Sequence, residues 1–227
     1  MNVIDIINEV VNNFLLGEQQ VWYHGTPDVR GVEQIGSFTP KTETTTYISD
    51  PKKWNELQNQ MQDARASSDE DQYFQLLDQA GALRKSMTYK KPIYFTKNRA
   101  VASTYADPKR AFDYQTSKPS VLQVKIDDSG KVLEVPAHGQ RFRMINADFV
   151  KAALRNNGIP EEEINKYFDM FPNDVRDNRM SAETIGIIAQ LLGFDIVDVL
   201  GVLDSYHGGS VKSTVRMVFD PEKIHII

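Results

Sequence analysis

The chain has 227 residues, of which 41% are hydrophobic and 25% charged, as expected for one substantial globular domain and not for a disordered segment. It contains no cysteine, which excludes disulfides and cysteine-ligated zinc, and its four histidines lack ligand-like spacing, so no metal site is predicted. The net charge of -5 disfavours direct nucleic-acid binding without excluding a local basic patch, and the absence of a signal-like start or a membrane-length apolar run predicts a soluble cytoplasmic protein with no membrane role.

Residues 1–17 are predicted to form an N-terminal amphipathic helix that precedes the main domain at 18–227. Apolar residues recur at helical spacing over 2–16, and Gly17 supplies a stop. We expect this helix to pack on the domain that follows it, and binding to a partner is the alternative.

The next predicted element is a strand over 20–24, which leads into a turn at Gly25-Thr26-Pro27. After a polar, threonine-rich stretch, helical periodicity resumes at Asp50-Pro51 and is broken at Ser67-Ser68-Asp69. This pattern predicts a helical hairpin, inserted between two strands, at about 50–90.

Short strands alternate with helices in the rest of the chain. The patterns predict a strand at 93–95 and a helix at 99–106 capped by Asn98. Strands at 121–126 and 131–135 follow, joined by a hairpin-like turn at 127–130. A second helical insertion is predicted at about 140–193, with helices at 147–156, 161–171 and 181–192, the last capped by Ser181. Strands at 195–203, 214–219 and 224–227 complete the chain, and a hairpin loop is expected at 204–210, with target recognition as its alternative role. Together these elements indicate an α+β fold and not a doubly wound sheet.

The segment Trp22-Tyr23-His24-Gly25-Thr26 is the first candidate for a binding site. A glycine lets a flat ligand approach the backbone, whose N–H and C=O groups can bond a carboxamide edge. The side chains of His24 and Thr26 can bond sugar hydroxyls. A histidine that merely ends a strand is the alternative.

Two tyrosines form the second candidate. Tyr94 lies on a predicted strand, and Tyr105 lies on the last turn of the helix that follows. If strand and helix pack together, the two rings face one slot that suits a flat, electron-poor ring, and a pyridinium gains a cation–π contribution of about 0.5–2 kcal/mol. Ordinary core packing of both tyrosines is the alternative.

These segments, followed by Val218-Phe219-Asp220-Pro221, resemble the NAD cleft of ADP-ribosyltransferases of the diphtheria-toxin and poly(ADP-ribose) polymerase class, the His-Tyr-Glu class. The chain looks most similar to the small transferase domains of phage-encoded polyvalent proteins. The resemblance covers 20–26, 92–106 and 213–227. It implies split antiparallel sheets around an NAD cleft, interrupted by the helical insertions, and a location in the host cytoplasm if the protein is phage-encoded.

The resemblance implies a role for each matching residue. His24 would bond the adenosine ribose with help from Thr26, and Gly25 would hold the nicotinamide carboxamide through its backbone. Tyr105 would stack on the nicotinamide, and Tyr94 would close the other side. NAD would be a substrate, and no metal is implied.

The chain departs from the family at two positions. A serine that binds the carboxamide matches Ala102, which leaves neighbouring Ser103 as its substitute. The catalytic glutamate matches Val215, and losing such an electrostatic group costs about 10²–10³ in rate. Three replacements are open: Thr214 after a one-residue shift, Asp204 from the preceding segment, or an acidic residue of a partner.

The implied activity is mono-ADP-ribosylation, in which ADP-ribose passes from NAD to a host protein or another macromolecule and nicotinamide is released. Tyr105, Thr214 and Asp204 are the residues expected at the reacting centre. The alternative is a catalytically degenerate module, such as a phage structural or accessory protein, that keeps the fold and binds NAD or a protein. An RNA 2′-phosphotransferase is disfavoured, because no basic cluster is present for a phosphate.

Overall fold

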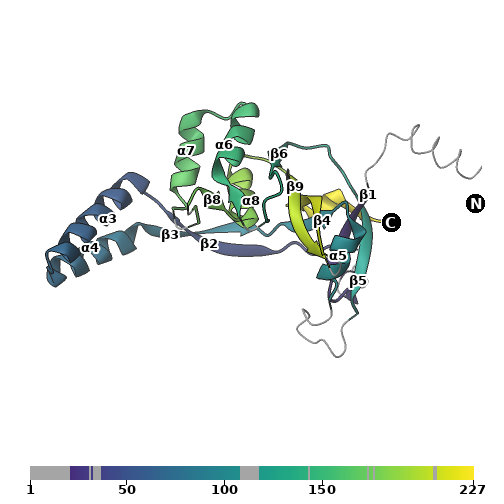
Figure 1. Cartoon of the computed structure of the whole chain (residues 1–227), viewed down its shortest axis with the longest axis horizontal. Helices are drawn as coiled ribbons and strands as arrows, with labels where there is room; N and C mark the ends of the chain where they lie inside the picture. Colours follow the sequence, from purple (N-terminus) through teal and green to yellow (C-terminus); the bar gives the residue numbers. More distant parts are fainter. Residues whose placement is uncertain are drawn as a thin grey trace, which may run out of the picture.

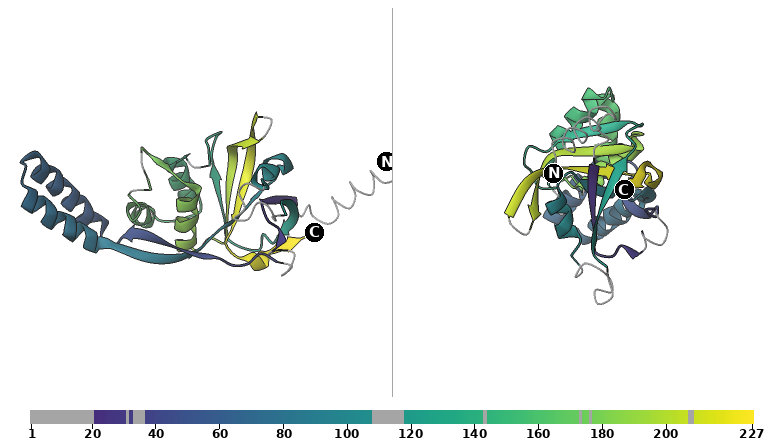
Figure 2. Two further views of the ribbon diagram at one scale, coloured as in Figure 1. Left: turned by 90° about the horizontal axis from the view of Figure 1, so that it is seen from below. Right: turned by 90° about the vertical axis from the view of Figure 1, so that its right-hand side faces the viewer.

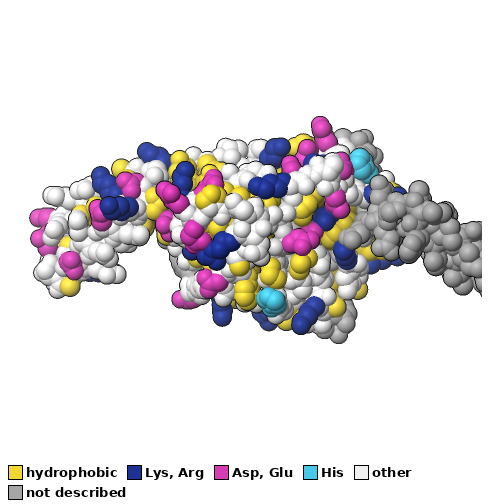
Figure 3. Space-filling model, turned by 90° about the horizontal axis from the view of Figure 1, so that it is seen from above, with side chains coloured by type: hydrophobic (Ala, Val, Ile, Leu, Met, Phe, Trp, Pro, Cys, Tyr) yellow, Lys and Arg dark blue, Asp and Glu magenta, His cyan; other side chains and the backbone are white. Residues whose placement is uncertain are grey.

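The computed structural model describes residues 21–30, 32, 37–107, 118–142, 144–172, 174–175, 177–206 and 209–227. The helix predicted over 2–16 lies outside these ranges. Within them, no helix has the length and apolar character needed to cross a membrane, and no three acidic or histidine side chains are grouped to hold a metal ion. On the face shown in Figure 3, basic and acidic side chains are interspersed.

A seven-stranded sheet forms the centre of the molecule, with strand order β11-β5-β1-β4-β10-β9-β6 (Figure 1). Its strands are β1 (Val21–Thr26), β4 (Ile93–Thr96), β5 (Ser120–Ile126), β6 (Val132–Pro136), β9 (Ile196–Tyr206), β10 (Gly209–Val218) and β11 (Ile224–Ile226). Two separate two-stranded sheets, β2–β3 and β7–β8, accompany it. The α+β class is therefore as predicted. Among the described strands only the β6–β9 pair is parallel, which departs from the expected antiparallel arrangement.

Three helices cover one face of this sheet (Figure 1). They are α6 (Ala147–Asn156), α7 (Glu161–Asp169) and α8 (Ala182–Leu191), beside the short strands β7 (Ile145–Asn146) and β8 (Arg179–Met180). Their buried apolar faces meet Val215, Met217 and Phe219 in the largest hydrophobic core. These alternate positions share a face because side chains of a strand point to opposite sides in turn. All three helices are confirmed, as is the Ser181 cap, whose hydroxyl accepts from the Thr184 N–H at 3.1 Å.

The opposite face of the sheet carries a smaller core and a buried ion cluster. Trp22, Phe95 and Val218 are buried together. In the ion cluster, Arg216 of β10 donates from Nε and Nη2 to the Asp198 carboxylate of β9 at 2.7 and 2.6 Å. Its guanidinium also pairs with Asp128 and lies 4.4 Å from the ring centre of Trp22. This cluster fixes β10 against β9 directly behind Val215.

An arm projects from this body (Figures 1 and 2). It consists of the ribbon β2 (Thr42–Ile48) and β3 (Arg84–Lys90), with the helical hairpin α3 (Pro51–Ala66) and α4 (Glu70–Leu83) at its tip. The hairpin has its own core, which includes Trp54, Leu57 and Leu76. The two predicted helices are confirmed, with N-caps Asp50 and Asp69. Both strands of the ribbon were absent from the sequence-based prediction.

Two predicted connections are wrong. β5 and β6 do not form a hairpin, because β5 pairs with β1 and β11 while β6 pairs with β9. The turn between them is local: the Asp127 carboxylate accepts from the Ser129 N–H at 2.8 Å and from its hydroxyl at 2.7 Å. Such a turn satisfies its own polar groups without requiring the flanking strands to pair. In addition, β1 continues through Thr26, so the expected turn at Gly25 starts later.

Candidate functional site

The candidate site lies where the central sheet splits. β4 pairs with β10 from Ile93 to Thr96, whereas its described pairing with β1 is limited to Tyr23↔Thr96. Beyond Thr96, helix α5 (Arg99–Tyr105) takes the place of a strand and contacts both β1 and β9. Asn98 starts this helix by accepting from the N–H groups of Ala100 and Val101 at 2.9 and 3.3 Å.

A cavity of about 670 Å³ opens at this split, a size within the usual range for small-molecule sites. Its walls come from β1, β4, α5, the first turn of α8, the β9–β10 pair and Phe142. The lining residues are Tyr23, His24, Gly25, Tyr94, Phe95, Thr96, Val101, Ala102, Tyr105, Phe142, Ser181, Ala182, Glu183, Asp204 and Val215.

Five residues predicted from the sequence meet in this cavity: His24, Gly25, Tyr94, Tyr105 and Asp204. They belong to four elements, of which β4 and α5 are consecutive, whereas β1 and β9 come from distant parts of the chain. Tyr94 and Tyr105 both line this cavity, and the space beside them is called the slot below. The cavity thus unites the two candidate sites found separately in the sequence.

Three other predicted residues lie outside the lining. The Thr26 hydroxyl donates to the Asp28 carbonyl at 2.9 Å, and the Ser103 hydroxyl donates to the Ala100 carbonyl at 2.7 Å. Thr214 lies at the register shift between β10 and β9. The first two hydroxyls are engaged by their own backbone, and a one-residue shift to Thr214 does not bring a side chain into the cavity.

His24 lines the cavity, and its ring is held by one hydrogen bond and by contacts with the rings of Phe38 and Phe95. Its Nδ1 lies 2.8 Å from the Tyr94 carbonyl oxygen. Because a carbonyl only accepts, Nδ1 carries the proton, and Nε2 of the neutral ring is left as an acceptor. Burial lowers the pKa of His24, and the bond to the Tyr94 carbonyl opposes this shift only in part. The neutral ring is therefore favoured at pH 7.

Acid is expected to destabilise the fold through His24. Since its pKa is lower in the folded chain than in the unfolded chain, the unfolded chain binds the proton first as the pH falls below about 6.5. Relative to a His24→Gln variant, the wild type should lose up to about 1.4 kcal/mol of unfolding free energy per pH unit in that window. Urea denaturation between pH 5 and 8 measures this difference. Parallel pH profiles for the two proteins would contradict it.

Aromatic rings form the walls of the slot. Tyr94 packs edge-to-face against Phe142, with ring centres 5.4 Å apart. Burial raises the pKa of Tyr94, so its ring remains a neutral phenol. Tyr105 is 43% exposed, which leaves part of its ring surface accessible at the cavity. A flat ligand in the cavity can therefore contact both residues.

Gly25 has a packing reason to be glycine. A Cβ atom built on it would lie 1.8 Å from the Ala102 carbonyl oxygen. This backbone contact brings α5 directly onto β1. Packing of α5 on β1 is therefore sufficient to explain why residue 25 is glycine. The bond from the Gly25 backbone to a carboxamide stays a prediction.

Val215, which the resemblance matches to the catalytic glutamate, lines the cavity, and its aliphatic side chain offers no charge. Two carboxylates lie elsewhere in the lining. Asp204 of β9 is buried and accepts from the Ser213 hydroxyl at 2.7 Å; burial raises its pKa, and this hydrogen bond opposes the rise. Glu183 enters from α8 and was not found from the sequence. An acidic residue in the first turn of a helix is ordinary, so no local signal marks it.

Chemically, the cavity combines aromatic walls, a histidine acceptor and two carboxylates. No lysine or arginine of the described chain belongs to the lining. This set suits a ligand with hydroxyl groups and a flat ring that carries positive charge. No protein-family model, curated protein sequence or solved structure matches this chain.

Proposed function

We propose that the chain is a NAD-dependent mono-ADP-ribosyltransferase that acts on a host protein or another macromolecule. The observation that carries the proposal is the meeting of His24, Tyr94 and Tyr105 in one cavity. They come from two strands and a helix, and their motif order resembles that of the transferase class. A scaffold has no chemical need for all three at one cavity.

In this proposal, Tyr94 and Tyr105 receive the nicotinamide ring between them. Nε2 of neutral His24 accepts a hydrogen bond from a ribose hydroxyl. The glycosidic bond breaks with its electron pair passing to the nicotinamide nitrogen, which neutralises the pyridinium. A nucleophile of the acceptor then bonds the anomeric carbon and gives its proton to solvent. The chain contributes mainly orientation and electrostatic stabilisation.

A binding module without transferase activity is the second candidate. Val215 favours it, because this valine lines the cavity where a charged group is needed for the reaction. The buried Asp204 and the exposed Glu183 are the remaining acids. If neither replaces the missing glutamate, NAD binds without turnover.

The two candidates separate in an experiment with labelled NAD. The purified chain is mixed with bacterial lysate, and both macromolecular label and free nicotinamide are followed. We expect His24→Ala to weaken NAD binding about tenfold, as loss of a hydrogen bond does, and Tyr105→Ala to weaken it by about 3- to 30-fold, the range of a cation–π contact. Phe74→Ala, which removes an exposed ring of the arm, is the control and should change neither NAD binding nor label transfer.

Label transfer that is reduced in both cavity variants supports the transferase. Protection of the wild type by NAD against thermal unfolding, without nicotinamide release, supports the binding module. Neither protection nor release would contradict both candidates.

A further inference from the structure

Glu183 is placed at the cavity by the start of α8. Ser181, Ala182 and Glu183 all line the cavity, and the Ser181 cap fixes this first turn. Within the described chain, no lysine or arginine forms an ion pair with Glu183. A carboxylate without a cationic partner therefore stands at the edge of an aromatic slot.

A tyrosine of the inserted ribbon holds this carboxylate. The Tyr89 side chain is buried, and its hydroxyl donates to Oε1 of Glu183. The same hydroxyl lies 3.0 Å from Oε2 of Glu43, whose other oxygen pairs with Lys91. Glu43 thus has its own cation, whereas among the described residues Glu183 is held by the hydroxyl alone.

The ribbon is itself fastened to α8. The Gln190 side chain donates to the Lys90 carbonyl at 2.9 Å and accepts from the Lys90 N–H at 3.1 Å. This reciprocal pair lies next to Tyr89 in β3, so the ribbon cannot slide along the helix without breaking it. The insertion is therefore part of the wall that presents Glu183.

We propose that Glu183 is the charge partner of a flat cationic ring bound between Tyr94 and Tyr105, and that Tyr89 is the residue that positions its carboxylate. The proposal rests on the proposed function in one respect, the identification of that ring with the nicotinamide end of NAD. The aromatic walls, the two carboxylates and the lack of a basic side chain in the described lining carry it. Asp204 is less suited to the role, because it is engaged by Ser213 and its charged form is disfavoured by burial.

Two small probes test this proposal without requiring turnover of NAD. The 1-methylnicotinamide cation and neutral nicotinamide share a ring and a carboxamide and differ in charge. Calorimetry should show that the wild type binds the cation about tenfold more tightly, as a partly screened ion pair provides. Glu183→Gln should remove this ion-pair part of the preference and leave only the part that the aromatic walls supply, and Tyr89→Phe should reduce the preference about threefold. A merely structural role of Tyr89 would change both affinities and leave their ratio unchanged.

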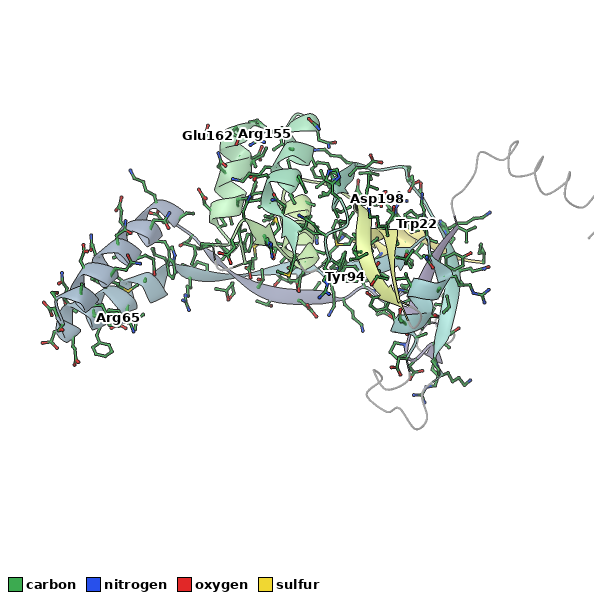
Figure 4. The ribbon with its side chains drawn as sticks, in the orientation of Figure 1. Trp22, Arg65, Tyr94, Arg155, Glu162 and Asp198 are labelled. Atoms are coloured by element: carbon green, nitrogen blue, oxygen red, sulfur yellow. The ribbon has the colours of Figure 1, made fainter. Side chains whose placement is uncertain are left out.

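Glu162→Gln is the matched control. Glu162 also occupies the second position of a helix, in the exposed first turn of α7, and Figure 4 shows it at the outer end of the helical layer, away from Tyr94. The preference should persist in this variant. The proposal is overturned if the wild type shows no preference, if Glu183→Gln keeps all of it, or if Asp204→Asn alone removes it.

Failure of this proposal and failure of the proposed function are distinguishable. A cation preference that depends on Glu183, in a chain that neither binds nor cleaves NAD, supports the charge partner and overturns the transferase. Nicotinamide release by a Glu183→Gln variant that binds NAD and the methylated cation as tightly as the wild type overturns the role of Glu183 and leaves the transferase in place. If both proposals hold, Glu183→Gln should raise the NAD concentration needed for half-maximal release about tenfold without slowing release at saturation, because the ring loses its positive charge as the glycosidic bond breaks.

Discussion

Replacing Arg216 with alanine is expected to lower the free energy of unfolding by about 3–5 kcal/mol, the cost of breaking a buried ion pair. The Arg216 side chain is only 6% exposed, and that of Asp198 is 7% exposed. Without the guanidinium, the Asp198 carboxylate stays in the sheet with neither of its two hydrogen bonds from Arg216. Urea denaturation at pH 7 measures the loss.

Arg155→Ala provides the control for this prediction. Arg155 pairs with Glu161 with similar geometry, but the two side chains are 48% and 51% exposed. An exposed pair contributes about 0–1 kcal/mol. Figure 4 shows Arg155 on the helical layer, well apart from Asp198. Equal losses in the two variants would show that burial does not set the strength of the Arg216 cluster.

Gly25→Ala is expected to cost about 3 kcal/mol, near the upper end for overpacking, and to abolish NAD binding. The added Cβ would lie 1.8 Å from the Ala102 carbonyl oxygen, so α5 has to move away from β1. A backbone atom cannot relieve the contact by changing rotamer. Because α5 carries Tyr105 and a wall of the cavity, its displacement removes the slot. Thermal unfolding with and without NAD measures both effects.

Gly81→Ala separates this contact from a general effect of alanine. Gly81 lies inside α4, and a Cβ built there meets nothing within 4 Å. Alanine in an open helical position stabilises by about 0.5–1 kcal/mol relative to glycine. A Gly25→Ala variant that is as stable as the wild type and still protected by NAD would contradict the close approach of α5 to β1.

Local signals in the sequence were sufficient for the helices. The start of α3 was predicted because Asp50-Pro51 is a strong capping pair, and that of α8 because Ser181 precedes an apolar helical run. Strands with a buried face, such as β4, were also predicted. Each of these elements is specified by residues within one or two turns of the chain.

The pairing of strands that are far apart in the sequence was not predictable from local signals. The residues of β2 alternate between exposed and half-buried, but the half-buried positions Glu43, Thr45 and Tyr47 form no continuous apolar face, and the strand pairs with β3 from a distant part of the chain. The turn at 127–130 was predicted as a hairpin because it satisfies the local rules, but the strands on either side have other partners.

The residues of the candidate site also divide into those that local motifs reveal and those that only the packing of distant elements brings together. His24, Tyr94 and Tyr105 were found because they lie in motifs of recognisable order. Glu183 was missed because it looks like any acidic residue at the start of a helix, and only the packing of α8 against the slot brings it to the cavity. The second carboxylate, Asp204, was found as one of three alternatives, and the cavity separates it from Thr214.

The central claim is that NAD occupies the cavity at the split of the sheet. Calorimetric titration of the full chain with NAD, beside the His24→Ala, Tyr105→Ala and Phe74→Ala variants, tests it most directly. We predict one binding site that is weakened about tenfold by His24→Ala, is weakened by Tyr105→Ala, and is unchanged by Phe74→Ala. Equal affinity in all four proteins, or no binding by the wild type, would contradict the claim.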